Sequence, residues 1–269
     1  MAERTEAGLR PSPGRHGSWT ILFGVWSIAA VVRGALLVLA GDFDSDPDAY
    51  RVIAETLSVH GGFGLPNESG TWRPTAFRPP LYPWVLSWLV IDGTLSPWAV
   101  GVLHFVLGMA TVTLAASLAG RFFCKSNGRT GNVGFVSIVM LVVACDPLLL
   151  WQSRLLMTET MATFLATLLW WLWVHGQSVA DASNAKQRWK LSLPRPPVAL
   201  ACGVVFALAF LCRPTFLVQL GLLSSAIAAI GVRSLREIRS GRPKIGWPTC
   251  FVVSLCLVCQ KLFQSGGPL

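Results

Sequence analysis

The sequence predicts an all-α fold, a polytopic bundle of about seven transmembrane helices with further helices lying along the membrane surface. Composition is the first observation: 53% of the 269 residues are hydrophobic and only 13% are charged, which is too apolar for an ordinary soluble domain. Apolar runs long enough to cross a bilayer are the second. They are expected at 19–41, 97–120, 132–150, 157–176, 196–212, 214–232 and 247–264.

The distribution of positive charge predicts the orientation of the bundle. Lys and Arg cluster in alternate connecting segments, which the positive-inside rule assigns to the cytoplasm together with the N-terminus. These segments are 4–15, 121–129, 186–195 and 233–244. We therefore interpret the net charge of +9 as a topological signal and not as a nucleic-acid-binding surface. Residues 1–18 are expected to be a cytoplasmic tail, 19–264 the membrane domain and 265–269 a short C-terminal tail.

The same alternation places the loop 42–96 outside the cytoplasm. It holds only if the apolar stretch from Pro80 to Ile91 does not cross the membrane. That stretch is bounded by Pro79-Pro80 and by Asp92-Gly93, and it is too short for a span. We expect it to form an interfacial helix on the outer surface.

Four aspartates at the start of this loop are the first candidates for chemistry. Asp42, Asp44, Asp46 and Asp48 alternate over seven residues, and charged groups at this density must lie in water or in a wet cavity. The sequence from Asp46 to Gly61 is typical of a loop entering an amphipathic helix. Asp46 or Asp48 could cap that helix, and one of the four could instead take part in a reaction.

Two further polar residues lie where the chain meets the membrane. Arg78, followed by two prolines, offers a planar set of donors at the height of lipid headgroups, which suits a phosphate, although it could simply extend toward headgroups. Glu159 is the only acid in the fourth expected span, close to its outer end. It could have a functional role or pair with Arg154 or Arg213.

The remaining polar residues of the spans have simpler interpretations. Asp146, before Pro147, is expected to end a helix, and Arg33 is expected to be the structural partner of an acid. Six of the seven cysteines fall in expected spans, where a thiol is a small apolar side chain, so no disulfide framework is expected. The first apolar run is too long for a cleaved signal peptide.

Four motifs in this order resemble the polyprenyl-phosphate-dependent glycosyltransferases of the C superfamily, in particular the protein mannosyltransferase and aminoarabinose transferase branch. The motifs are Asp46-x-x-x-Tyr50, Arg78-Pro-Pro-Leu-Tyr82-Pro83, Thr158-Glu159 and Cys212-Arg213-Pro-Thr. The resemblance covers roughly residues 19 to 232. It implies an enzyme that moves a sugar from a lipid phosphate to a lipid, glycan or protein acceptor on the non-cytoplasmic face, in a bacterial plasma membrane.

The resemblance also implies roles for individual residues. Asp46 matches the loop aspartate that acts as general base, Glu159 matches an acid at the start of a later span, and Arg78 and Arg213 match basic residues that face the donor phosphate. Tyr82, in the same motif as Arg78, is grouped with the phosphate-binding residues. Asp48 is the further catalytic candidate.

The chemistry leaves two questions open. One carboxylate acting as base fits single displacement with inversion, whereas retention requires a second carboxylate about 5 Å away, which Asp48 or Glu159 could supply. Asp44, Asp46 and Asp48 form overlapping Asp-x-Asp pairs that could bind Mg²⁺ or Mn²⁺. The resemblance itself implies no metal cofactor.

Members of that family continue for several further spans, so the sequence is expected to represent a C-terminally shortened chain. Two other classes of function stay open, and the shortening favours the second of them. One is a transporter or flippase for a lipid-linked or anionic solute, although the ionisable residues gather near one face and not at the bilayer midplane. The other is an inactive membrane scaffold.

Overall fold

The computed structural model describes residues 15–67, 71–76, 78–123, 128–176 and 196–216. These residues form eight helices and four short strands, so the described chain is mainly helical, as expected. The chain divides into two compact units, residues 1–175 and 176–269. All elements from α1 to α7 belong to the first unit, apart from the last residue of α7.

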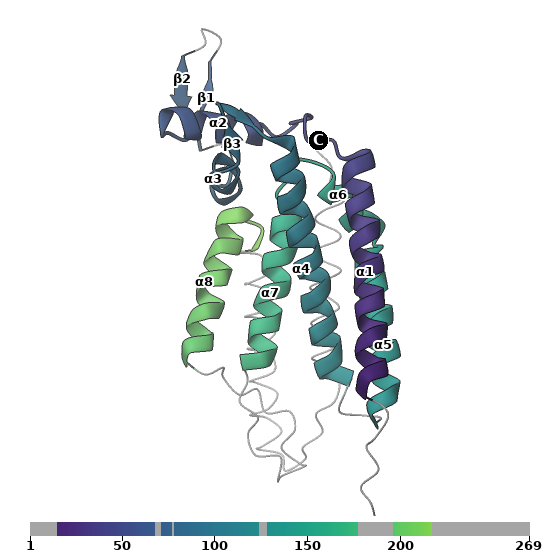
Figure 1. Ribbon diagram of the computed structural model, residues 1–269. Helices are drawn as coiled ribbons and strands as arrows, with labels where there is room; N and C mark the ends of the chain where they lie inside the picture. The colour runs from purple at the N-terminus through teal and green to yellow at the C-terminus, as the bar shows by residue number, and fades with distance from the viewer. Residues whose placement is uncertain (1–14, 68–70, 77, 124–127, 177–195, 217–269) are drawn as a thin grey trace, which may run out of the picture. The chain divides into compact units, whose positions relative to one another are not determined.

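Two helices are long and apolar enough to cross a membrane. They are Ser18–Ala40, within α1 (Arg15–Ala40), and Pro97–Arg121, within α4 (Pro97–Phe123). Both coincide with spans expected from the sequence, and they make this a membrane protein. They lie side by side in Figure 1. Trp26 of α1 donates a hydrogen bond to the Thr113 hydroxyl of α4 at 3.2 Å.

The third expected span, 132–150, is broken into two helices. α5 (Gly128–Ala144) and α6 (Pro147–Ser153) meet at an angle of 47°, and together they are apolar enough for one bent span. The break follows from Pro147, which has no N–H to donate to the preceding turn. Asp146 caps the new helix, since its Oδ1 accepts from the backbone N–H groups of Leu148 and Leu149 at 2.9 and 3.1 Å.

The other expected spans are confirmed only as helices or lie outside the described residues. α7 (Glu159–Gly176) has 18 residues and is not among the helices apolar enough to span. α8 (Pro196–Cys212), in the second unit, is apolar but has only 17 residues. Expected span 247–264, and 214–232 apart from its first three residues, lie outside the described residues. A bundle of seven spans is therefore not confirmed.

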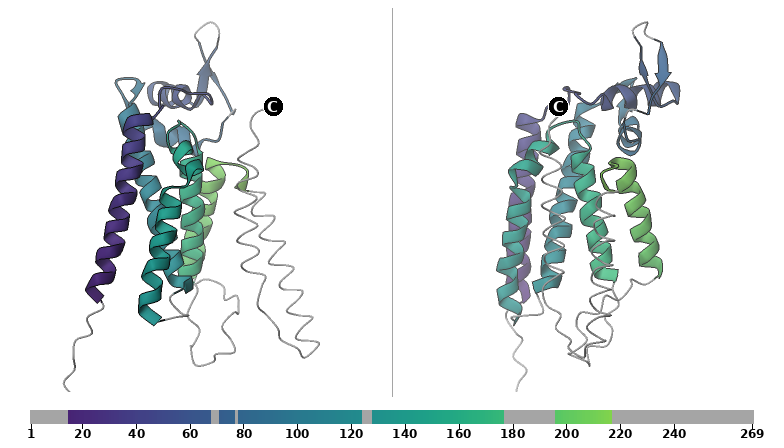
Figure 2. Two further views of the ribbon diagram at one scale, coloured as in Figure 1. Left: turned by 90° about the vertical axis from the view of Figure 1, so that its right-hand side faces the viewer. Right: turned by 180° about the vertical axis from the view of Figure 1, so that it is seen from behind.

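The segment between α1 and α4 gathers at one end of the first unit, above the start of α4 and α7 (Figures 1 and 2). It contains α2 (Tyr50–His60), the amphipathic helix expected from the sequence. α2 ends at Gly61, whose φ of 67° is readily adopted by glycine. Strands β1 (Gly64–Pro66) and β2 (Trp72–Pro74) then form an antiparallel hairpin that the all-α prediction did not include.

The stretch expected to lie along the surface forms no helix long enough to cross a membrane. Its helix, α3 (Leu81–Ser87), has only seven residues, or roughly 10 Å of length. β3 (Val90–Ile91) and β4 (Thr94–Leu95) follow as a second hairpin, joined by Asp92 and Gly93, which both have positive φ. Trp84 of α3 and Trp88, which follows the helix, are 46% and 68% exposed and lie edge to face. Exposed tryptophans of this kind are typical of a membrane–water interface.

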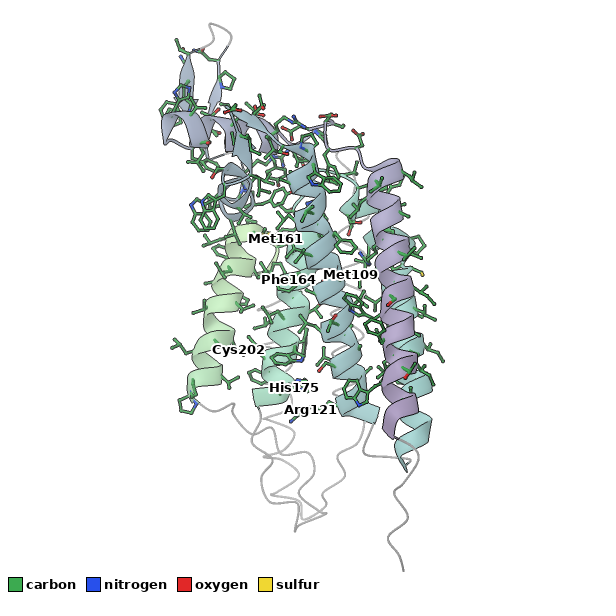
Figure 3. All side chains as sticks on the ribbon, viewed as in Figure 1. Met109, Arg121, Met161, Phe164, His175 and Cys202 are labelled. Atoms are coloured by element: carbon green, nitrogen blue, oxygen red, sulfur yellow. The ribbon has the colours of Figure 1, made fainter. Side chains whose placement is uncertain are left out.

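The buried core of the first unit lies between α1, α4 and α5. It is formed by small and flexible apolar side chains, namely Ala29, Met109, Val112, Met140 and Ala144. Small residues let helix backbones approach closely, which favours association within a membrane. Figure 3 shows that oxygen and nitrogen atoms gather at the end of the unit that carries α2, whereas Arg121 and His175 mark the opposite end.

Candidate functional site

Several polar side chains gather around Tyr50, the first residue of α2. We call this group, which contains Asp48, Arg78, Thr158 and Glu159, the polar cluster. The Tyr50 side chain is only 4% exposed and packs edge to face against Tyr82, with ring centroids 5.2 Å apart. Thr158 forms a side-chain hydrogen bond with it, and Asp48, Arg78 and Glu159 act on it electrostatically. Burial, the largest of these effects, raises the pKa of Tyr50 to about 12, so the phenol is neutral at physiological pH.

Asp48 and Arg78 form an ion pair beside this ring. Nη2 of Arg78 donates to Oδ1 of Asp48, and Nε donates to the Asp48 carbonyl oxygen at 3.0 Å. The guanidinium carbon lies 5.7 Å from the centre of the Tyr50 ring. The two side chains are 26% and 25% exposed, so they remain in contact with solvent. The Arg78 side chain is thus positioned by two contacts, one to the Asp48 carboxylate and one to the Tyr50 ring.

Ala49 lies between Asp48, which forms the ion pair with Arg78, and Tyr50, whose ring lies beside the guanidinium. It has φ 59° and ψ 24°, a left-handed conformation that is uncommon for a residue with a side chain. This turn separates the loop from the helix and sets the direction in which Asp48 leaves the backbone. Left-handed residues other than glycine cost free energy and tend to occur where function constrains the backbone.

Asp46 caps α2. Its Oδ1 accepts from the N–H of Tyr50 at 2.8 Å, and its Oδ2 accepts from the N–H of Arg51 at 2.9 Å. Burial raises the pKa of Asp46 above its usual 3.8, while these backbone hydrogen bonds act in the opposite direction. The sequence left capping and catalysis open for this residue. The structure shows the cap. Oδ2 also accepts from Val52 N–H at 3.5 Å, so the capacity to accept a further hydrogen bond lies with Oδ1.

The aspartates of the loop bond to different groups. Asp44 is 85% exposed and pairs with Arg51 at 3.0 Å, whereas Asp46 bonds to the backbone and Asp48 to Arg78. Among the described residues, no group of three His, Cys, Asp or Glu side chains is arranged to hold a metal ion.

Glu159 opens α7 and lies close to Tyr50. Its side chain is 7% exposed, and its charge raises the pKa of Tyr50, as does that of Asp48. Arg154, one of the partners considered from the sequence, donates from Nε to the carbonyl oxygen of Ala40 and lies over the Trp151 ring at 4.7 Å. Arg154 thereby ties the end of α1 to the turn before α7.

Tyr82 packs between the Tyr50 ring and His104 of α4. Its side chain is fully buried, and its hydroxyl is hydrogen-bonded to Nε2 of His104 in α4 at 2.8 Å. Nδ1 of His104 lies 2.8 Å from the Ser153 carbonyl oxygen of α6. Because the hydroxyl is directed toward α4, Tyr82 does not face solvent beside Arg78. Its observed contacts position Tyr50 and α3.

Arg213, the second basic residue assigned to the donor phosphate, belongs to the other compact unit. It follows the end of α8, and its N–H donates to the Ala209 carbonyl oxygen at 2.9 Å. Of the residues predicted from the sequence, the structure therefore brings Asp48, Arg78 and Glu159 together around Tyr50. Asp46 lies at the start of the same helix, and Tyr82 lies behind it.

Fold and site define a membrane protein with a cluster of acidic and basic side chains at one end of its helices. No protein-family model matches the chain, and neither a curated protein nor a solved structure is significantly similar to it.

Tyr50 and Thr158 of the polar cluster, and His104, which bonds to Tyr82, are residues that the sequence did not single out as site residues. Tyr50 and Thr158 stand in the motifs of the resemblance, next to residues that were selected. Their own contribution depends on a contact across 108 positions of the chain, which no local pattern reveals. His104 is a lone histidine in an apolar span, and such a residue in the interior of a membrane protein is a functional hypothesis in itself.

Proposed function

We propose that this protein is a membrane glycosyltransferase, which moves a sugar from a polyprenyl-phosphate donor to an acceptor on the non-cytoplasmic side. The observation that carries the proposal is the grouping of Asp48, Arg78 and Glu159 around Tyr50, at one end of helices that could cross a membrane. The residue types fit the reaction, which needs a cation for the phosphate and a carboxylate for the acceptor proton.

Arg78 is the proposed ligand of the donor phosphate. In the absence of substrate its guanidinium is paired with Asp48 and rests against Tyr50. A phosphate can accept two parallel N–H donors from arginine, so it competes directly with the Asp48 carboxylate. Donor binding would then release the Asp48 carboxylate from Arg78. Asp48 would become available as a second carboxylate of the site, beside the base.

The transfer itself requires one bond to break and one to form at the anomeric carbon. The bond from this carbon to the phosphate oxygen breaks, and its electron pair remains on the phosphate, beside Arg78. The acceptor oxygen forms the new bond and gives its proton to a carboxylate. Asp46 is the proposed base because α2 fixes its position, and a raised pKa makes a carboxylate a stronger base.

A single base fits inversion of configuration. Asp48 and Glu159 are the further catalytic carboxylates in this proposal, Asp48 as the residue that exchanges partners with the phosphate and Glu159 as a fixed charge near Tyr50. Arg213 is retained as a second phosphate ligand, on the strength of its motif alone. Tyr82 is proposed to position Tyr50 and not to bind phosphate directly, because its hydroxyl is bonded to His104.

The proposed placement follows from charge distribution and helix ends. We place the N-terminus in the cytoplasm and the cluster on the outer side of a plasma membrane of bacterial type, which the chain would cross several times. The exposed Trp84 and Trp88 beside the cluster fit a position at the lipid headgroups, where a polyprenyl phosphate presents its charged end.

The decisive experiment supplies the purified chain with a radiolabelled polyprenyl-phosphate sugar and candidate acceptors. Release of polyprenyl phosphate together with a glycosylated acceptor is expected. Asp46→Asn should lower the rate at least about 100-fold, as for loss of a general base, and Arg78→Ala should weaken donor binding. Asp44→Asn is the matched control, because Asp44 is exposed in the same loop.

The other outcomes separate the competing functions. Donor that moves across a vesicle membrane without cleavage would indicate a transporter, and neither movement nor cleavage would leave a scaffold. Equal activity in Asp46→Asn and in the unsubstituted protein would remove Asp46 as the base. Unchanged donor affinity in Arg78→Ala would mean that the Asp48–Arg78 pair is structural.

A further inference from the structure

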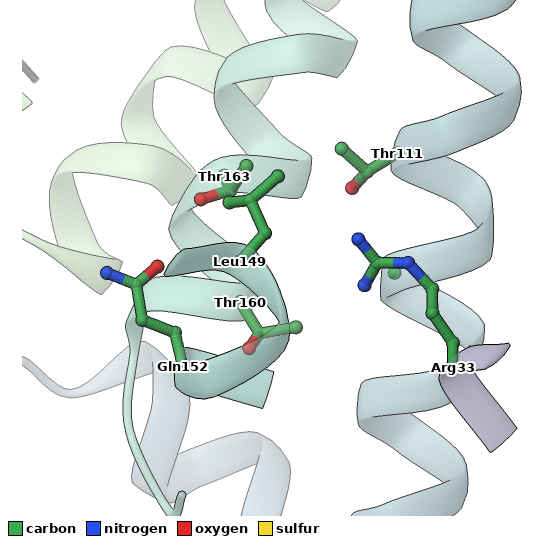
Figure 4. Close-up of a pocket in the computed structure, with 7 residues that line it drawn as sticks. Arg33, Thr111, Leu149, Gln152, Thr160 and Thr163 are labelled. Atoms are coloured by element: carbon green, nitrogen blue, oxygen red, sulfur yellow. The ribbon is translucent and has the colours of Figure 1, made fainter. Parts of the chain in front are cut away.

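A second polar site lies inside the first unit, between α1, α4, α6 and α7 (Figure 4). It is a small cavity. The volume within which the centre of a water-sized sphere can move is about 10 Å³, so the cavity holds one such sphere. Its polar lining comes from Arg33, Thr111, Gln152, Thr160 and Thr163. None of these residues belongs to the cluster around Tyr50.

Arg33 dominates the charge of this cavity. Its side chain is only 4% exposed, and it lies about 10 Å before the end of α1. Nη2 donates to the Val143 carbonyl oxygen at 2.9 Å, whereas Nε is buried and has no hydrogen-bond partner among the described residues. A buried guanidinium with five N–H groups requires further acceptors.

The backbone of α4 makes room for this guanidinium. A Cβ atom added at Gly108 would lie 2.7 Å from Nη1 of Arg33, closer than such atoms normally approach. Gly108 itself lines the cavity. The absence of a side chain there therefore lets Arg33 reach the space between the helices, where Figure 4 shows it directed toward Leu149 and Thr160.

The opposite wall carries threonine hydroxyl groups that are not used elsewhere. In Figure 4 the hydroxyls of Thr160 and Thr163 are turned away from Arg33, and rotation about χ1, for which threonine in a helix has two favoured rotamers, would turn them toward it. The hydroxyl oxygens of Thr160 and Thr163 are buried and lack a hydrogen-bond partner within the described part of the chain, as does Oε1 of Gln152. In contrast, Thr167 of the same helix donates to the Thr163 carbonyl oxygen at 2.8 Å. A half-turn of the Gln152 amide would direct its NH₂ group into the cavity.

The charges near Arg33 are unbalanced at close range. Asp146 and Cys145 act on Arg33 electrostatically, but Oδ1 of Asp146 accepts two backbone N–H groups at the start of α6. The direct acceptor of Arg33 is a neutral carbonyl. Arg33 is thus opposed by Asp146 electrostatically, but its direct hydrogen-bond acceptor carries no charge. This is costly for a buried guanidinium, and a water molecule in the cavity would add no compensating charge.

We propose that this cavity binds one small monovalent anion of halide size, held by the Arg33 guanidinium and by the hydroxyls of Thr160 and Thr163. The anion compensates the buried charge and accepts hydrogen bonds from groups on α1 and α7. It thereby links the first helix to the helix that carries Glu159. The site is independent of the proposed glycosyl transfer, because it shares no residue with that reaction.

Thermal unfolding of the purified full chain tests this proposal. The unfolding midpoint is measured as chloride replaces gluconate, an anion too large for the cavity, at constant ionic strength. We expect a saturable rise with chloride. Thr160→Val should weaken the apparent chloride affinity at least about fivefold through loss of one donor, and Thr167→Val, on the same helix but outside the cavity, should not change it.

A midpoint that is equal in chloride and gluconate would overturn the proposal, as would identical chloride curves for Thr160→Val and Thr167→Val. Bromide gives an independent test, since its anomalous scattering locates it in crystals. A peak beside Arg33 that is lost in Arg33→Gln is the expected result. Density of water strength at saturating bromide would show that the cavity holds water instead. If Arg33→Gln does not fold, Thr160→Val provides the same comparison.

Discussion

The most direct perturbation of the site is Asp46→Ala, because the structure gives the backbone hydrogen bonds that it removes, the longest of them from Val52 N–H at 3.5 Å. The Asp46 carboxylate accepts from Tyr50 N–H at 2.8 Å and from Arg51 N–H at 2.9 Å. Loss of a cap costs about 0.5–2 kcal/mol, and hydrogen bonds to a charged group lie at the upper end of this range. At about 1.4 kcal/mol for each factor of ten, a loss of about 2 kcal/mol corresponds to about thirtyfold easier opening of α2.

Amide hydrogen exchange followed by mass spectrometry measures this effect on peptides that cover Tyr50–His60. Asp44→Ala is the matched control. Asp44 also pairs with Arg51, at 3.0 Å, but its side chain is 85% exposed, and such surface pairs contribute about 1 kcal/mol or less. We expect about thirtyfold faster exchange of the α2 amides in Asp46→Ala and less than about fivefold in Asp44→Ala.

Equal exchange rates in the two variants would refute the conclusion that the Asp46 carboxylate stabilises the first turn of α2. The same pair of variants separates structure from catalysis when Asp46→Asn is added. In Asp46→Asn the amide oxygen can keep the bond to one side of the helix start, whereas the NH₂ group cannot accept the N–H groups that Oδ2 now binds, and asparagine cannot act as a base. A rise in exchange smaller than that of Asp46→Ala, together with a loss of transfer as large as that of Asp46→Ala, is therefore expected for Asp46→Asn.

Three further predictions concern the buried contacts. Tyr82→Phe leaves Tyr50 as the single tyrosine, and its phenol should titrate by absorbance near pH 12. Because the pKa of Tyr50 in the folded protein lies above the ordinary value of 10.0, the stability that it contributes is fully present below pH 10 and should be lost as the pH rises through 12. Titration near pH 10 would contradict this. His104→Phe should lower the free energy of unfolding by about 2–4 kcal/mol in denaturant titrations, since the Tyr82 hydroxyl loses its partner; a change below about 1 kcal/mol would contradict this. Gly108→Ala should lower the unfolding midpoint by displacing Arg33, and an unchanged midpoint would show that the side chain relocates freely.

Much of the local structure could be predicted from sequence because local patterns determine it. Helical periodicity and an Asp upstream of an amphipathic run predicted α2 and allowed for its cap, and Asp146 before Pro147 predicted a helix end. The shortness of Pro80–Ile91 predicted a segment that stays at the surface, and α3 has only seven residues. Each of these inferences depends on neighbours within a few positions.

The arrangement of the site could be predicted only in part, because it depends on contacts between distant segments. Nothing in the local sequence indicates that Arg78 pairs with Asp48, 30 residues earlier, instead of extending toward lipid. The direction of the Tyr82 hydroxyl is decided by His104, in another helix. The β1–β2 hairpin was also missed, since three-residue strands are too short to establish a period of two.

The interruption between α5 and α6 has a consequence for a helix that is far away in sequence. In an unbroken helix the Val143 carbonyl oxygen would accept the N–H of residue 147, but a proline stands at that position. This vacant oxygen is the one that Arg33 of α1 binds, at 2.9 Å. Pro147 in α6 thus leaves a carbonyl oxygen of α5 free to bind the guanidinium of Arg33 in α1. Replacing Pro147 with alanine would give the oxygen back to its own helix and set the two donors in competition.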